Sequence, residues 1–149
     1  MTSEIKHRYG KNIHIFSHLY LSTLLADLSR PQCHQPKINQ IIHFLYSHLL
    51  GLVVSCEFPS AAIEWETRMT KIHPHQKLKT HIVSQQQNVV VVNLARAGTL
   101  PSHVCYETLN YLLPPEIVRQ DHIIAARQTN ETHQVTGSHF GASKIGPDI

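Results

Sequence analysis

The sequence predicts an α/β domain in which a parallel β-α-β unit and a hairpin follow a mainly helical region. Residues Val89–Leu94 form a nearly continuous run of β-branched and apolar side chains, which is typical of a strand buried on both faces of a parallel sheet. Apolar residues then recur at helical spacing over 104–112, and "HIIAA" at 122–126 is a second short apolar run. Strand, helix and strand in this order indicate a βαβ unit.

Residues 1–87 are predicted to form the mainly helical region. Two apolar patterns with helical spacing precede Arg30-Pro31 and Phe58-Pro59, and each favours an amphipathic helix that packs on another part of the chain. The first pattern consists of Ile13, Phe16, Tyr20, Leu24 and Leu28, and the second of Ile38, Ile42, Leu45, Leu49 and Leu52. A third, short helix is expected over 61–69, followed by an irregular or partly extended connection over 70–88.

Residues 88–149 are predicted to form the α/β region. Thr99 could serve as the N-cap of its helix, because Pro101 suits a first helical turn and Pro114-Pro115 ends the pattern. Val104, Cys105, Thr108, Leu109 and Leu112 give this helix its expected inner face. After Arg127 the turn residues and the alternation predict two further strands around Thr136-Gly137.

Composition limits the class of protein. The chain has 149 residues, of which 42% are hydrophobic and 15% charged, which is globular and long enough for one domain with a core. A net charge of +3 suits an anionic ligand, but it is too small and too scattered to imply a nucleic-acid partner. Three widely spaced cysteines indicate reduced thiols. No convincing secretory or membrane segment is found, so we expect a soluble cytoplasmic protein without a membrane partner.

The best candidate site lies where the valine strand ends and the helix begins. Ligands of open parallel sheets bind beyond the carboxyl ends of the strands, and a helix N-terminus there offers free N–H groups to a phosphate. Gly98 would allow close approach of the backbone, and Arg96 could add a bidentate contact. The alternative is that Arg96 is a solvated loop residue or an ion-pair partner.

Arg127 repeats the arrangement after the second predicted strand, so both arginines would face one crevice. The alternative for Arg127 is an arginine at the base of a hairpin, paired with Glu131 or Asp121.

Three segments in order carry a resemblance to a known family: "VVVVNLARAGTLPS", "RQDHIIAARQTNE" and "SKIG". They resemble the first half of the catalytic domain of uracil phosphoribosyltransferases, which are similar in fold to other type I phosphoribosyltransferases. The resemblance covers Asn88–Ile149 and, more loosely, Glu64–His81. It implies an incomplete type I phosphoribosyltransferase-like sheet at 88–149.

The resemblance also implies an activity and a set of binding residues. The family transfers ribose 5-phosphate from phosphoribosyl pyrophosphate to uracil, giving UMP in pyrimidine salvage, usually with Mg²⁺. The residues that match its substrate-binding positions are Arg96, Ala97, Gly98 and Thr99 in the pyrophosphate loop, with Arg127 and the hairpin residue Lys144. No catalytic residue is identified, and we expect a homo-oligomer.

The chain also departs from the family. Thr99-Leu100-Pro101-Ser102 replaces the usual continuation with a second glycine, and the 149 residues contain neither the ribose-5-phosphate loop nor the uracil-contacting segment. We therefore expect a truncated domain that is inactive as this chain alone. The alternative is a degenerate, non-catalytic module that binds a phosphate or nucleotide or mediates oligomerisation.

The remaining polar features have simpler expectations. Thirteen histidines raise the question of a metal, but no pair has a third ligand at a recognisable spacing, so no metal site is expected. Arg68–His81 is basic. It is either a solvated loop or a source of positive charge that attracts the substrate phosphate or RNA. Cys105 lies near His103, but it suits a helix core better than a nucleophilic pair.

Overall fold

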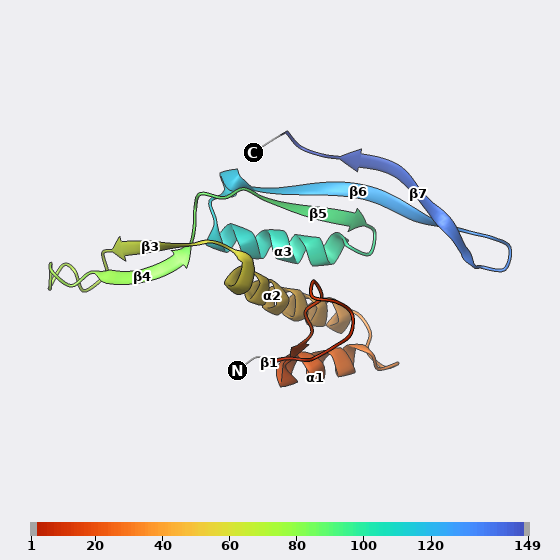
Figure 1. The fold of residues 1–149 in the computed structure, drawn as a ribbon, viewed down its shortest axis with the longest axis horizontal. Helices are drawn as coiled ribbons and strands as arrows, with labels where there is room; N and C mark the ends of the chain where they lie inside the picture. The colour runs from red at the N-terminus through yellow and green to blue at the C-terminus, as the bar shows by residue number, and fades with distance from the viewer. Residues whose placement is uncertain (1–2, 148–149) are drawn as a thin grey trace. The chain divides into compact units, whose positions relative to one another are not determined.

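A computed structural model describes residues 3–147 of the chain (Figure 1). The elements are β1 (Ser3–Glu4), β2 (Phe16–Ser17), α1 (Leu19–Leu28), α2 (Lys37–Glu57), β3 (Ser60–Trp65), β4 (Leu78–Val83), β5 (Val89–Ala95), α3 (Thr99–Leu112), a 3-10 turn (Pro115–Ile117), β6 (Val118–Thr129) and β7 (Val135–Lys144). They fall into two compact units, Met1–Tyr46 and Ser47–Ile149, which divide within α2. The fold is mixed α/β, which confirms the predicted class, whereas a division at residue 87 stays a prediction.

The first unit contains two short paired strands, α1 and the beginning of α2. Strand β1 is antiparallel to β2. Helix α2 confirms the second predicted helical pattern, whereas α1 covers only Tyr20–Leu28 of the first, because Ile13 precedes the helix and Phe16 lies in β2. No residue of α1 is buried, and Leu19 and Leu25 are among its exposed side chains. Ile41 of α2 is buried. The apolar spacing therefore predicted both helices, but it placed the start of the first one too early, and Leu21, Leu24 and Leu28 of α1 are only partly buried.

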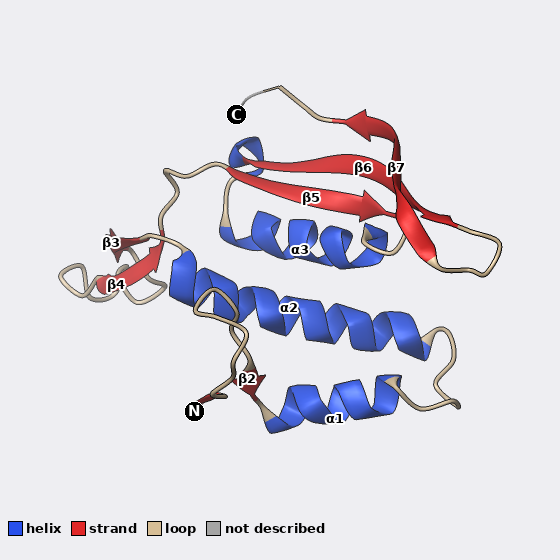
Figure 2. Cartoon of the chain, turned by 45° about the vertical axis from the view of Figure 1, so that its right-hand side comes forward, coloured by secondary structure: helices blue, strands red, loops and turns tan. Residues whose placement is uncertain are grey.

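The second unit is built on a three-stranded sheet in the order β5-β6-β7, with α3 against one face (Figure 2). Strand β5 is parallel to β6, which confirms the predicted β-α-β unit, and β7 is antiparallel to β6. A core cluster of Val54, Leu109, Leu113 and Val118 joins the end of α2, α3 and the start of β6. Leu113, rather than the expected Leu112, faces this core, while Pro114 follows as predicted.

The valine run predicted a strand buried on both faces, but β5 is covered on only one. Asn93 is buried and Val91 is partly buried, whereas Val92 and Leu94 are 52% and 56% exposed. The reason is that α3 packs against only one side of the sheet, so successive side chains alternate between cover and solvent. A run of β-branched residues reports strand preference, but it does not report how many faces are covered.

Residues 60–83 form a two-stranded antiparallel ribbon, so the helix predicted over 61–69 is wrong. Pairs run from Ser60 with Val83 to Trp65 with Leu78. Successive side chains of a strand alternate between its faces, which places Ala61, Ile63 and Trp65 together on one side. The i, i+4 pair that favoured a helix was weak evidence, and cross-strand pairing overrode it.

The hairpin between β6 and β7 turns at Asn130–Gln134, and not at Thr136-Gly137. Oδ1 of Asn130 accepts hydrogen bonds from the backbone N–H groups of Thr132 and Gln134, and His133 adopts a positive φ of 61°. An Asx-type turn of this kind competes well with a glycine turn. Thr136 and Gly137 instead belong to β7.

Helix α2 is the one described helix whose length and composition would allow it to cross a membrane. Its last turns do not stand free, since Val54 is buried in the core cluster and Leu50 packs against it. The predicted cytoplasmic location stays a prediction.

Candidate functional site

The candidate site is the junction of β5 and α3, where the chain leaves the sheet and starts the helix within four residues. Strand β5 ends at Ala95, residues 96–98 form a turn, and α3 begins at Thr99. The turn is closed by a hydrogen bond from the Gly98 N–H to the Leu94 carbonyl, 2.9 Å. The peptide bond between Ala95 and Arg96 is cis. The predicted strand–Arg-Ala-Gly–helix arrangement is therefore present.

Gly98 is required by a close approach of backbone to backbone. A Cβ at this position would lie 2.7 Å from the Leu94 carbonyl oxygen and 3.1 Å from Oδ1 of Asn93. Its φ of −76° is open to any residue, so space, and not backbone conformation, selects glycine here. The turn thus lies directly against the end of β5.

The N-terminus of α3 carries no side-chain cap. Gly98 occupies the N-cap position, so the prediction that Thr99 is the N-cap is wrong, and no acidic residue stands in the first turn. Arg96, Ala97 and Thr99 are exposed. The Gly98 and Thr99 N–H groups already donate to the carbonyls of Leu94 and Arg96, and Pro101 has no N–H. What can attract an anion here is the exposed Arg96 at the carboxyl end of a strand, beside the positive end of the α3 dipole.

Asn93 is the residue of this junction that the sequence analysis missed. It is only 2% exposed, its Nδ2 lies 2.9 Å from Nδ1 of His122, and it donates to Oγ1 of Thr99 at 3.4 Å. Within residues 3–147 its Oδ1 has no hydrogen-bond partner. One amide thereby connects β5, β6 and the first residue of α3. A polar residue at an inward position of a valine run was the signal that could have revealed it.

The register of the sheet places Arg127 and Lys144 on opposite sides of the junction. Ala95 is level with Ile124, so Arg127 lies three residues further along β6, about 10 Å beyond the last residue of β5. Lys144 is paired with His122 and is therefore level with Asn93. The sheet brings Lys144 into the row of the buried amide, but it does not place Lys144 next to Arg127.

The prediction that Arg127 follows the end of its strand is wrong. Strand β6 continues to Thr129, and Arg127 is paired with Ser138 of β7. The side chain is exposed. The ion pair expected in the alternative interpretation is not formed in the described part of the chain, because Asp121 is held by Arg119 instead.

Asp121 anchors the segment that follows β7. Its Oδ1 accepts a hydrogen bond from the Gly146 N–H at 3.0 Å, and Nη2 of Arg119 donates to its Oδ2 at 3.0 Å. The Gly146 hydrogen bond and the Arg119 guanidinium hold the pKa of this carboxyl below its usual range. The carboxylate is 4% exposed and therefore serves the fold and not the junction.

The sequence raised two alternative chemistries, a nucleophilic pair of Cys105 with His103 and a metal site. His103 pairs with Glu107 at 3.3 Å, and burial raises the pKa of the Cys105 thiol, which makes it a poorer nucleophile. Among residues 3–147 no three histidine, cysteine or acidic side chains gather as a metal site would require.

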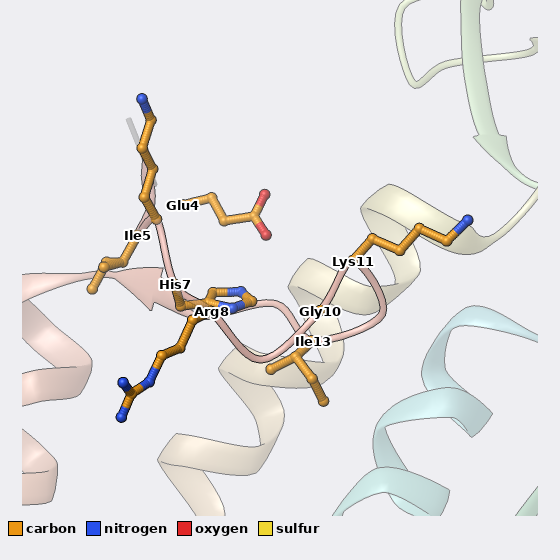
Figure 3. Close-up of a pocket in the computed structure, with 8 residues that line it drawn as sticks. Glu4, Ile5, His7, Arg8, Gly10, Lys11 and Ile13 are labelled. Carbon is orange, nitrogen blue, oxygen red and sulfur yellow. The ribbon is translucent and has the colours of Figure 1, made fainter.

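A separate hollow of about 660 Å³ lies in the first unit, lined by the loop that follows β1. Figure 3 shows Arg8 and Lys11 directed away from each other, and the carboxylate of Glu4 is engaged by His14 at 2.9 Å. The hollow therefore lacks converging groups for a ligand, and the β5–α3 junction remains the stronger candidate.

Comparison with known proteins bears on the fold alone. No protein-family model matches the chain, and no curated protein matches it. Among solved structures, the chain is similar to the AQ2163 protein from Aquifex aeolicus, with a TM-score of 0.60 and 14% sequence identity. The match covers 87% of this chain and 54% of the other, so the chain spans about half the length of that protein.

Proposed function

We propose that the chain is the first half of a uracil phosphoribosyltransferase-like domain and that the β5–α3 junction holds the pyrophosphate group of phosphoribosyl pyrophosphate. The observation that carries the proposal is the tight Arg96–Gly98 turn against β5, followed at once by an uncapped helix N-terminus. The three resembling sequence segments support the same assignment, and they include the strand that carries Arg127 and the end of the hairpin that carries Lys144.

Each residue of the junction would have a distinct role. The exposed Arg96 guanidinium would bind the pyrophosphate oxygens and neutralise their charge, and the positive end of the α3 dipole would add a favourable field. The buried Asn93 would keep the turn in place through Thr99 and His122. Transfer of ribose 5-phosphate to uracil displaces pyrophosphate, and charge stabilisation on this leaving group is what such a site supplies.

Mg²⁺ belongs to the proposal through the family resemblance. The described residues do not group three metal-ligating side chains, and magnesium is commonly held by substrate phosphates and water. We propose that the metal comes to this site with phosphoribosyl pyrophosphate. A cytoplasmic location and a homo-oligomeric assembly are part of the same proposal.

Binding of phosphoribosyl pyrophosphate by calorimetry tests the proposal. We expect measurable affinity in the presence of Mg²⁺, and we expect the variant Arg96→Ala to lose about tenfold, since a charge-assisted contact contributes roughly this factor. Arg8→Ala removes an exposed arginine of the first unit and is the matched control. Unchanged affinity in Arg96→Ala would remove this residue from the site.

A second assay separates the transferase from a non-catalytic module. The purified 149-residue chain is mixed with uracil and phosphoribosyl pyrophosphate, and UMP is measured. We expect binding without detectable turnover from this chain alone, because the family's ribose-5-phosphate loop is not among its residues. Robust formation of UMP would contradict that expectation and would show that the loop is dispensable.

A further inference from the structure

We propose that the far end of the β3–β4 ribbon is a docking surface for an anionic lipid bilayer. The proposal is independent of the phosphoribosyltransferase assignment. It concerns an apolar tip, formed by Trp65, Met69, Ile72 and Leu78, and two cations beside it, Arg68 and Lys71.

The apolar side chains become exposed only toward the end of the ribbon. At its base Ala61 and Ile82 face each other and are partly buried, whereas Trp65 and Leu78 form the last pair and are 55% and 48% exposed. Met69 and Ile72, in the loop beyond this pair, are 50% and 67% exposed. Figure 1 shows the loop at the far end of the ribbon, away from the three-stranded sheet of the same unit. The exposed apolar side chains are thus concentrated at the end of the ribbon, where a flat partner such as a bilayer can contact them.

The loop is ordered by its own hydrogen bonds. Oγ1 of Thr70 accepts from the Thr67 N–H at 2.8 Å and donates to the Gln76 carbonyl at 3.2 Å. The Met69 carbonyl accepts from the N–H groups of Ile72 and His73. Satisfied backbone groups lower the cost of placing a loop at the edge of a hydrocarbon phase, where unpaired N–H and C=O groups are costly.

The charges beside the tip select an anionic partner. Within residues 3–147 the side chains of Arg68 and Lys71 form no ion pair, whereas Lys77 and Lys79 are paired with Glu64 at 3.5 and 3.2 Å. Arg68 and Lys71 outnumber Glu66, the exposed acidic residue of the same loop, so the loop beside the exposed apolar side chains is positive. This matches an anionic membrane surface, which attracts basic residues electrostatically and takes apolar ones into its interface.

Other partners satisfy only half of this arrangement. A nucleic acid would attract the cations and could stack on Trp65, but it would leave Met69 and Ile72 exposed, because aliphatic side chains offer no stacking surface. A second copy would bring the same positive charge against the tip. The expectation of no membrane partner rested on the lack of a spanning segment, which a peripheral loop does not need.

Trp65 is the sole tryptophan of the chain, so its fluorescence reports on the tip directly. The 149-residue protein is titrated with vesicles of phosphatidylcholine alone and with vesicles that also contain phosphatidylserine. We expect a blue shift of the emission, and quenching by brominated phosphatidylcholine, with the phosphatidylserine vesicles only. Unchanged emission on these vesicles would overturn the proposal.

Two double variants test the two halves of the surface. Arg68→Gln with Lys71→Gln should lower the partition into phosphatidylserine vesicles about 25-fold, since each basic residue near an anionic surface contributes about fivefold. Met69→Ser with Ile72→Ser should abolish quenching by the brominated lipid. Lys6→Gln with Lys11→Gln makes the same charge change on exposed residues of the first unit and should leave partition unchanged.

Three results would contradict the proposal. Equal loss in the Lys6/Lys11 control would show that general charge, and not the tip, drives association. A change of Trp65 emission with single-stranded RNA but not with vesicles would assign the surface to nucleic acid. Sedimentation showing a dimer that Met69→Ser with Ile72→Ser dissociates, without vesicle binding by the unchanged protein, would assign it to a second copy.

Discussion

The two halves of the β5-β6-β7 sheet differ in what covers them. The inner half consists of β5 and the part of β6 that pairs with it, Val118–Ile124. Helix α3 packs on this half, and Val104, Leu109 and Val118 are buried there. The outer half is the two-stranded hairpin in which Ala125–Thr129 of β6 pairs with Val135–Phe140 of β7. Its Val135 and Phe140 are 62% and 66% exposed. The junction with Arg96 belongs to the inner half and Arg127 to the outer half. Packing against α3 therefore supports the turn that carries Arg96, whereas Arg127 lies on a hairpin whose apolar side chains are exposed.

The largest contrast is expected for apolar truncations. Leu109→Ala should lower the free energy of unfolding by about 3 kcal/mol, because Leu109 is 2% exposed and its removal leaves a cavity. Phe140→Ala in the outer half should change it by less than about 0.5 kcal/mol. Urea unfolding of both variants measures the contrast. Equal losses would mean that the hairpin is packed as tightly as the core.

Glycine substitutions probe the junction more locally. Gly98→Ala should destabilise the protein by about 2 kcal/mol, because the new methyl group would meet the Leu94 carbonyl at 2.7 Å. Gly141→Ala is the control in β7, where the nearest atom, in Ile124, is 3.9 Å away. Thermal unfolding compares the two. A neutral Gly98→Ala would show that the turn does not lie against β5.

A smaller effect, with a defined pH dependence, is expected at Asp121. Its pKa is lowered in the folded state, so its contribution to stability is fully present above the ordinary carboxyl pKa of about 3.9. The contribution is lost as the pH falls through the lowered folded value. Asp121→Asn should therefore lower the melting temperature near neutral pH, and the difference from the unchanged protein should shrink in acid. The control Glu131→Gln removes one exposed carboxylate from the hairpin turn, and an equal loss of melting temperature near neutral pH in this variant would contradict the assignment to Asp121.

Much of the inner half could be predicted from local sequence. The strand at Val89–Ala95 and the helix that ends before Pro114 follow from apolar spacing and from proline chemistry, and the strand–helix–strand order then indicates the parallel pairing. The turn at Arg96–Gly98 was also predicted. The strand, the helix and the turn depend on residues that are close together in the chain, where backbone preference and side-chain pattern agree.

The remaining features depend on partners that are distant in sequence. The ribbon at Ser60–Trp65 exists because it pairs with Leu78–Val83, and no local pattern indicated that pairing. The role of Asn93 requires His122, which is 29 residues away, and the place of Lys144 follows from the register of β7. One face of β5 is exposed because α3 packs only on the other face. The valine run does not show how many faces of the strand are covered.

We propose that the β5–α3 junction, and not the hairpin, receives pyrophosphate. Titration of the isotope-labelled chain with inorganic pyrophosphate, followed by backbone amide NMR, tests it most directly. We predict shifts centred on Ala97, Gly98 and Thr99, a loss of about tenfold in affinity for Arg96→Ala, and a smaller loss for Arg127→Ala, whose backbone lies about 10 Å further along β6. Shifts confined to the hairpin amides, or an Arg127→Ala loss that equals the Arg96→Ala loss, would contradict binding at the junction.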